Sequence, residues 1–133
     1  MSQLHVEAEA TAQASPETVW ALVSDATKYP RWGPWSDGHY KESARGVGAV
    51  QVLRSAQRYL GRHTTSVERI LEFEEDRHLA YTVIGGIPVR NYRADVTLTP
   101  SAGGTHIRWV ADWDDGAIVV ANSLRVYEPS PNI

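Results

Sequence analysis

The sequence has 133 residues, a net charge of −3 and no cysteine. A chain of this length has room for one domain, which buries about two thirds of the surface that its unfolded form exposes. The absence of cysteine excludes a disulfide scaffold, a thiolate nucleophile and a cysteine-ligated zinc site, and the slightly acidic balance disfavours nucleic acid as a partner. Five Trp and six Tyr against one Phe show a bias toward aromatic side chains that carry a polar group.

We expect no targeting or membrane segment in this sequence. The first residues include charged side chains, where a secretory signal needs a positive start and an apolar stretch. The longest aliphatic run, at 117–121, is too short to span a bilayer. We therefore expect a cytoplasmic protein with no membrane span, in which residues 1–128 form a single ligand-binding domain and 129–133 a flexible tail.

Local patterns predict one strand and two short helices at the start of the chain. Residues 5–14 alternate between polar side chains and an inward face of valine and alanine, as in a half-exposed strand. Serine, proline and an acidic residue at 15–17 indicate a helix start. Asp25 is placed to cap a second short helix over 26–29. A Gly- and Pro-rich loop with two tryptophans follows at 32–35.

Five further strands, separated by turns, predict an antiparallel meander over 49–54, 63–73, 79–84, 90–98 and 105–113. One parity is apolar and aromatic: Leu79, Tyr81, Val83, Tyr92, Ala94, Val96, Leu98, Ile107, Trp109, Ala111 and Trp113. The other parity is polar: Arg93, Asp95, Thr97, His106, Arg108 and Asp112. One face of the sheet is therefore expected to be apolar and the other solvated.

A one-sided sheet needs a cover, and the C-terminal segment is the candidate. If residues 116–128 are helical, their apolar side chains share one face. The β-branched residues at 118–120 leave an extended strand as the alternative.

Motifs that carry a family resemblance run in order along residues 3–113. They are Ala14-Ser15-Pro16-Glu17-Thr18-Val19-Trp20, Asp25, Tyr29-Pro30-Arg31-Trp32, Gly46-Val47-Gly48, Val67-Glu68, Leu79-Ala80-Tyr81, Leu98-Thr99-Pro100 and Gly103-Gly104-Thr105. In this set the chain resembles the START-like or SRPBCC superfamily, in its polyketide cyclase/dehydrase branch. The resemblance implies an α+β helix-grip fold, in which an antiparallel sheet of about six to seven strands, with two short N-terminal helices, wraps around a C-terminal helix and encloses an apolar ligand cavity.

The segment after Trp113 departs from the family pattern, because only twenty residues follow it and the last five include two prolines. We therefore expect a shortened C-terminal helix. Three arrangements follow from this expectation: an open groove, a cover supplied by a second chain in a homodimer, or a shortened coding sequence whose end differs from that of its relatives.

The sequence argues against a metal site. The histidines at 5, 39, 63, 78 and 106 lack the spacing of a local ligand pair. The acidic turn at 112–116 is similar to a calcium loop only in part, because Gly116 and Ser123 stand where that loop needs an oxygen ligand and a bidentate glutamate. We expect neither a metal nor a cofactor.

Four polar residues on the predicted inward face are candidates for catalysis. Arg90 and Tyr92 occupy successive inward positions, Tyr81 lies on the neighbouring strand, and His63 lies two strands away. His63 is the default base, because histidine titrates near neutral pH. Tyr81 and Tyr92 are placed to donate hydrogen bonds to an enolising carbonyl. The alternative for each is structural: satisfied side chains in the sheet, and an Arg90 that reaches solvent from the start of its strand.

Loop tryptophans and inward side chains are the candidates for ligand contact: Trp32, Trp35, Val67, Val83, Val96, Trp109 and Trp113. Alanine lining opposite aromatic lining is typical of a cavity. We therefore predict a protein that binds a small hydrophobic molecule of polyketide, lipid or quinone type. The alternatives are a cofactor-free polyketide cyclase or dehydratase that uses the four catalytic candidates, and an interaction module that uses the uncovered apolar face.

Overall fold

The computed structural model describes residues 3–59 and 62–114. Its elements are β1 (Gln3–Ala12), α1 (Pro16–Val23), the 3₁₀ helix η1 (Ala26–Arg31), β2 (Trp35–Glu42), β3 (Val50–Tyr59), β4 (Arg62–Glu74), β5 (His78–Gly85), β6 (Arg90–Ser101) and β7 (Gly104–Asp114). The predicted helix or strand at 116–128 and the tail at 129–133 lie outside the described residues. Within the described residues, no helix has the length and apolar character needed to cross a membrane.

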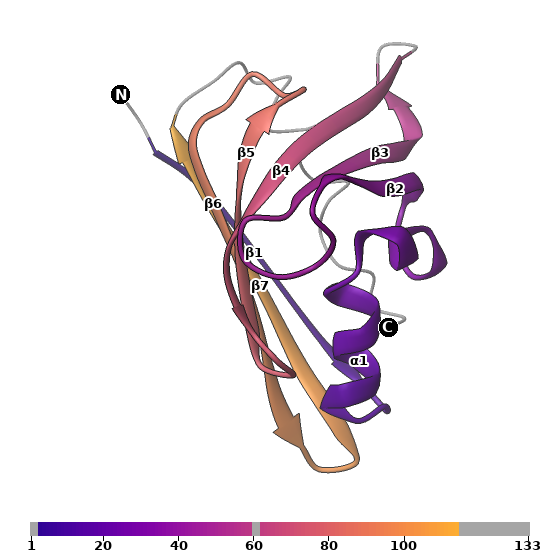
Figure 1. Cartoon of the computed structure of the whole chain (residues 1–133). Helices are drawn as coiled ribbons and strands as arrows, with labels where there is room; N and C mark the ends of the chain where they lie inside the picture. Colours follow the sequence, from indigo (N-terminus) through magenta and orange to yellow (C-terminus); the bar gives the residue numbers. More distant parts are fainter. Residues whose placement is uncertain (1–2, 60–61, 115–133) are drawn as a thin grey trace.

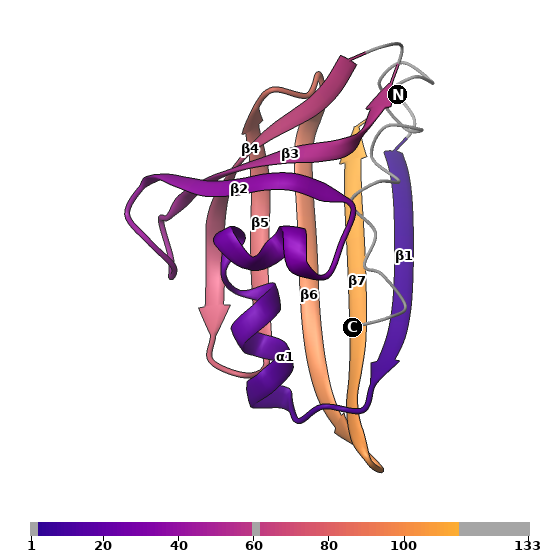
Figure 2. The ribbon, with the colours of Figure 1, turned by 90° about the vertical axis from the view of Figure 1, so that its right-hand side faces the viewer.

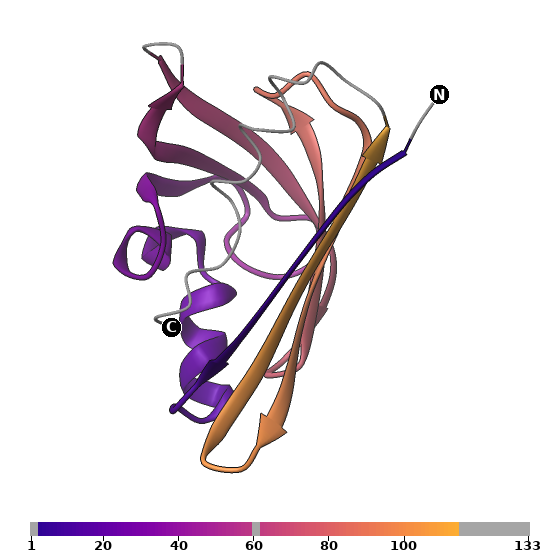
Figure 3. The same ribbon diagram turned by 180° about the vertical axis from the view of Figure 1, so that it is seen from behind.

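The strands form one antiparallel sheet in the order β1-β7-β6-β5-β4-β3-β2. Strands β2 to β7 pair with their neighbours along the chain, as a meander requires, and β1 pairs with β7 at the other edge, which Figure 3 shows from behind. The sheet is strongly curved. In Figure 2, β2 and β3 therefore run nearly horizontally, whereas β7 and β1 run nearly vertically. Helices α1 and η1 lie on the concave side, which is the inner face of the sheet (Figures 1 and 2).

Both N-terminal helices begin where the sequence predicts. At the start of α1, Ser15 Oγ accepts a hydrogen bond of 3.3 Å from the backbone N–H of Thr18. At the start of η1, Asp25 Oδ1 accepts a hydrogen bond of 3.0 Å from the backbone N–H of Thr27. Helix α1 contacts β6 and β7, and η1 contacts β2 and β3. The caps therefore fix where each helix starts, and the apolar packing fixes where it lies.

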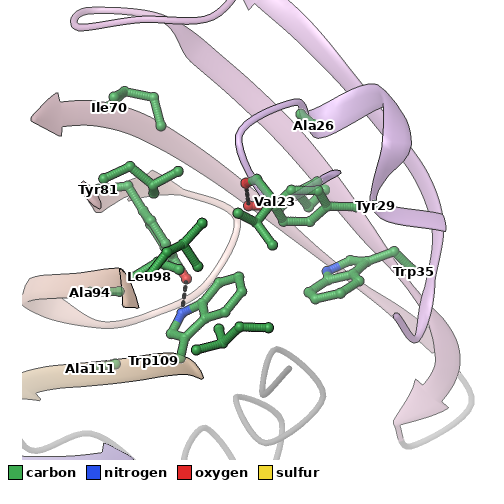
Figure 4. Close-up of a cluster of buried hydrophobic side chains, with 14 of the residues drawn as sticks. Val23, Ala26, Tyr29, Trp35, Ile70, Tyr81, Ala94, Leu98, Trp109 and Ala111 are labelled. Carbon is green, nitrogen blue, oxygen red and sulfur yellow. Dashed lines mark hydrogen bonds between the residues drawn. The ribbon is translucent and has the colours of Figure 1, made fainter. Parts of the chain in front are cut away.

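The alternation predicted for the last three strands is confirmed. Their inner side chains are buried: Leu79, Tyr81, Tyr92, Ala94, Val96, Leu98, Ile107, Trp109, Ala111 and Trp113. Most of their outer positions carry polar or charged side chains, and all of these positions are half-buried or exposed except Ala80, which is buried. The buried side chains join those of α1 and η1 in one apolar core, part of which Figure 4 shows.

Strand β2 has no counterpart among the strands predicted from the sequence. It is an edge strand in which Trp35 is buried and the other residues are half-buried or exposed, so its apolar periodicity is weak. Gly38 lets β2 pass close to η1, because a Cβ atom at this position would lie 2.0 Å from the carbonyl oxygen of Ala26. The missing side chain of Gly38 is thus what allows this close contact between strand and helix.

Candidate functional site

A row of side chains crosses the inner face of the sheet from β3 to β5. In the strand register Gln51 pairs with Glu68, and Glu68 pairs with Val83. Residues opposite each other in an antiparallel pair point to the same face. Gln51 and Glu68 are each 2% exposed, whereas Val83 is half-buried. The row therefore brings a carboxyl group into a face that is otherwise mostly apolar.

Two neutral donors hold Glu68. Gln51 Nε2 donates a hydrogen bond of 2.8 Å to Glu68 Oε1, and Ser66 Oγ donates one of 2.9 Å to Glu68 Oε2. Burial disfavours the charged carboxylate more than these two bonds favour it, which raises the pKa of Glu68 to about 7. The carboxyl group therefore gains and loses a proton near neutral pH.

Aromatic rings continue the inner face beside Glu68. Trp109 Nε1 donates a hydrogen bond of 3.1 Å to the Tyr81 hydroxyl (Figure 4). The ring centroids of Tyr81 and Tyr92 lie 6.1 Å apart, and those of Tyr92 and Trp113 lie 5.8 Å apart. Burial is the main cause that raises the pKa of both tyrosines, and the charge of Glu68 adds to it. Both hydroxyls therefore stay protonated at neutral pH.

The two predicted loop tryptophans pack around Tyr29. Its ring centroid lies 4.8 Å from that of Trp32 and 4.9 Å from that of Trp35. Trp32 Nε1 donates a hydrogen bond of 3.2 Å to the Leu22 carbonyl, and its side chain is half-buried. Trp35 is 3% exposed. The prediction of a loop position is wrong for Trp35, because it is the first residue of β2 and its side chain belongs to the core.

The structure separates two of the four catalytic candidates from the tyrosines. His63 is half-buried, and its Nδ1 donates a hydrogen bond of 2.7 Å to the Ser55 carbonyl of β3. Arg90 is exposed, so its predicted inward position is wrong. The cause is local: Asn91 has a φ of 52°, and the β6–β7 register shifts between Arg90 and Arg93. Such a bulge breaks the alternation of faces on which the prediction relied.

The three valines predicted to line the site fall on two faces. Val96 is fully buried and Val83 is half-buried, both on the inner face. Val67 pairs with Val52 and lies on the outer face, so its predicted inward position is wrong. The reason is the alternation along β4, which gives the inner position to its neighbour Glu68.

Sequence reasoning missed Glu68 as a site residue, although a signal was present. Ser66, Glu68 and Ile70 share one parity, and each is buried on β4. The apolar Ile70 marks that parity as inward, while the two polar residues make it look solvated. On β3, Gln51 and Leu53 show the same mixture opposite them.

The outer face of the sheet carries paired charges. His5 Nδ1 lies 2.5 Å from Asp112 Oδ1, and Arg93 Nε donates a hydrogen bond of 2.9 Å to Asp95 Oδ1. In the part of the chain that the structure describes, no group of three or more His, Asp or Glu side chains is arranged to hold a metal ion. The outer face of the described sheet therefore carries ion pairs between side chains that are half-buried or exposed.

Solved structures from several organisms share this fold. A protein of Thermobifida fusca is 26% identical, with a TM-score of 0.67 over 96% of this chain and 83% of its own. A protein of Chromobacterium violaceum is 20% identical, with a TM-score of 0.71 over 92% and 88%. Major latex-like protein 151 of Panax ginseng is 13% identical, with a TM-score of 0.70 over 93% and 91%. These likenesses confirm the helix-grip α+β fold.

No curated protein matches the sequence. The family model described as "Polyketide cyclase / dehydrase and lipid transport" matches residues 3–126, which is most of the chain. The match confirms the family resemblance seen in the sequence motifs. This chain therefore belongs to the polyketide cyclase/dehydrase and lipid transport family.

Proposed function

We propose that this protein binds a small hydrophobic molecule, of polyketide, lipid or quinone type, against the inner face of its sheet. The observation that carries the proposal is the row of rings of Tyr81, Tyr92 and Trp113, which crosses β5, β6 and β7 beside the small side chains of Ala94 and Ala111. Large flat rings with small neighbours are typical of an apolar binding surface. The family description, which includes lipid transport, supports the same class of ligand.

Val83 offers a position at which this proposal can be tested. Its side chain is half-buried on the inner face, whereas Val52 is half-buried on the outer face. Val83→Trp therefore adds bulk over the ring row, and Val52→Trp adds the same bulk on the opposite side. Nile red, a neutral apolar dye, is expected to bind about tenfold more weakly to V83W than to wild type and equally well to V52W. Equal affinities in all three proteins contradict the proposal.

Native mass spectrometry of the purified protein gives an independent test. A co-purified apolar molecule that is lost in V83W and retained in V52W supports binding at the inner face. A molecule retained equally in both variants places its site elsewhere and contradicts the proposal.

A second candidate function is a cofactor-free cyclase or dehydratase, which the placement of Glu68 favours. A carboxylate that titrates near neutral pH is suited to accept a proton from an acidic α-carbon, and the hydroxyls of Tyr81 and Tyr92 are suited to stabilise the enolate. Glu68 takes the role first predicted for His63, because its charge reaches both tyrosines. Turnover of a poly-β-ketone analogue by wild type, lost in Glu68→Gln, supports this function. Binding of the analogue without turnover excludes it.

A further inference from the structure

Glu68 is a buried acid whose described surroundings supply hydrogen bonds and no positive charge. Its neighbours from each packed element are uncharged at neutral pH: Gln51 on β3, Ser66 on β4, Tyr29 on η1, Tyr81 on β5 and Tyr92 on β6. Arg69, the next residue along β4, is exposed on the outer face. A carboxylate in such a place lacks the cation that usually accompanies a buried negative charge.

The negative potential of Glu68 reaches across the inner face. Its charge contributes to raising the pKa of Tyr29, Tyr81 and Tyr92, which come from three different elements. A negative potential that disfavours a tyrosinate favours a cation at the same place. Aromatic rings attract cations as well, and most strongly where water is excluded. The carboxylate and the ring row therefore favour the same kind of ligand group.

The inner face is only partly covered at Val83, which lies beside Glu68. Val83 is the register partner of Glu68 on β5 and lies on the same face. Its side chain is only half-buried, whereas Glu68 is 2% exposed. A ligand that lies over Val83 can thus place its polar end beside the carboxyl group, and its body must open a path to the rings of Tyr81, Tyr92 and Trp113, which are 2%, 6% and 3% exposed.

We propose that the ligand of this site is a hydrophobic molecule that carries a protonated amine, with its ammonium group paired to Glu68 and its apolar body against Tyr81, Tyr92 and Trp113. This inference rests on the proposed function, because it names the chemical class of the ligand at the same site. The two donors from Gln51 and Ser66 hold the carboxylate oxygens in place for the ammonium group.

The test uses two probes that differ in one group, 4-phenylbutylamine and 4-phenylbutan-1-ol. Isothermal titration calorimetry at pH 8 is expected to show that wild type binds the amine about tenfold more tightly than the alcohol. Glu68→Gln keeps the size of the side chain and removes its charge, with one acceptor oxygen replaced by an NH2 donor, so the two probes should then bind about equally. Glu72→Gln removes a carboxylate that pairs with Arg93 on the exposed outer face, and it should keep the preference for the amine.

A pH series on wild type tests the inference without any variant. Glu68 must lose its proton to pair with the ammonium group, so affinity for the amine should rise between pH 5.5 and pH 8 and then level off. Affinity for the alcohol should change little over this range. Equal binding of the two probes by wild type, a preference that survives in E68Q, or an amine affinity that does not rise with pH would each overturn the inference.

Nile red separates a failure of this inference from a failure of the proposed function. If the dye binds to wild type and is excluded by V83W while the amine shows no advantage, the site stands and the amine class is wrong. If the dye binds equally to wild type and V83W, or to neither, the proposed inner-face site is wrong, and the inference about the amine is wrong as well.

Discussion

The side-chain amide of Gln51 donates a hydrogen bond of 2.8 Å to the carboxyl group of Glu68 on the next strand, and both side chains are 2% exposed. The pair lies on the inner face of a sheet whose other buried residues are mostly apolar. Hydrogen bonds from neutral donors lower the free-energy cost of burying a carboxylate, but they do not neutralise its charge. Glu68 is therefore the described inner-face group whose charge changes near neutral pH.

Glu68 makes the stability of the protein depend on pH. Its pKa is raised from 4.5 to about 7 on folding, so the folded state holds the proton more tightly. The free energy of unfolding therefore loses about 3 kcal/mol from this group as pH rises from below 4.5 to above 7. Glu68→Gln removes this loss. In urea denaturation, the free energy of unfolding of E68Q should therefore rise relative to that of wild type between pH 5 and pH 8.

Glu72→Gln is the matched control for that experiment, because Glu72 lies on the same strand and is exposed. Its stability should follow that of wild type across the pH range. If the curves of E68Q and wild type run parallel from pH 5 to pH 8, Glu68 does not carry the proton that we assign to it.

Tyr29 ties η1 to α1 through one buried contact. Its hydroxyl donates a hydrogen bond of 2.8 Å to the carbonyl of Val23. Tyr29→Phe keeps the ring packing against Trp32 and Trp35 and removes the donor, so it should lower the free energy of unfolding by about 1–2 kcal/mol. Chemical denaturation measures this change, and an unaltered midpoint and slope would show that the bond contributes nothing net.

The sequence predicts the sheet well where one face is uniformly apolar. The side chains from Tyr92 to Leu98 and from Ile107 to Trp113 alternate without interruption, and every second one is buried. The sequence does not predict β2, because this edge strand has Trp35 as its one buried side chain. The prediction of a homodimer depends on the segment after residue 114, outside the described residues, and stays a prediction that light scattering can check.

The site was harder to predict than the fold, because it depends on single positions. Tyr81 and Tyr92 lie together on the inner face as expected. Alternation from Tyr92 back along the strand predicts an inward Arg90, and the positive φ of Asn91 interrupts that alternation. The sequence does not predict a buried Glu68, because a carboxylate in a strand is usually solvated, and its burial depends on donors from Gln51 on the next strand and from Ser66. A single sequence shows neither a bulge nor a cross-strand partner.

Gly38 is expected to tolerate no side chain. A Cβ atom there would meet the backbone oxygen of Ala26 at 2.0 Å, so either β2 or η1 must move. Gly38→Ala should cost about 1–3 kcal/mol of stability. Gly85→Ala is the control, since its Cβ would sit 3.6 Å from Val67 in ordinary contact, and it should change stability by less than about 1 kcal/mol. Equal effects of the two substitutions would rule out the close approach.

His5 on β1 pairs with Asp112 on β7, and this bond, followed by a second one to Glu7, raises the pKa of His5 above 6.5. The raised pKa means that its contribution to stability is present below pH 6.5 and is lost as pH rises through the folded value. A proton NMR titration should show the raised midpoint, and Asp112→Asn should lower it. Asp114→Asn makes the same charge change on β7 at a side chain that bonds Asn91, and it should leave most of the shift intact.

The pairing of β1 with β7 has a consequence for the order of folding. Strands β2 to β7 can form as successive β-hairpins, because each strand pairs with the next one along the chain. Strand β1 instead joins Gln3 to Asp114 and Ala12 to Thr105, and it must close a loop that contains nearly all the described chain. Such a contact forms late, after the meander has already lost its conformational freedom. Destabilising changes in β1 should therefore speed unfolding and leave the refolding rate nearly unchanged.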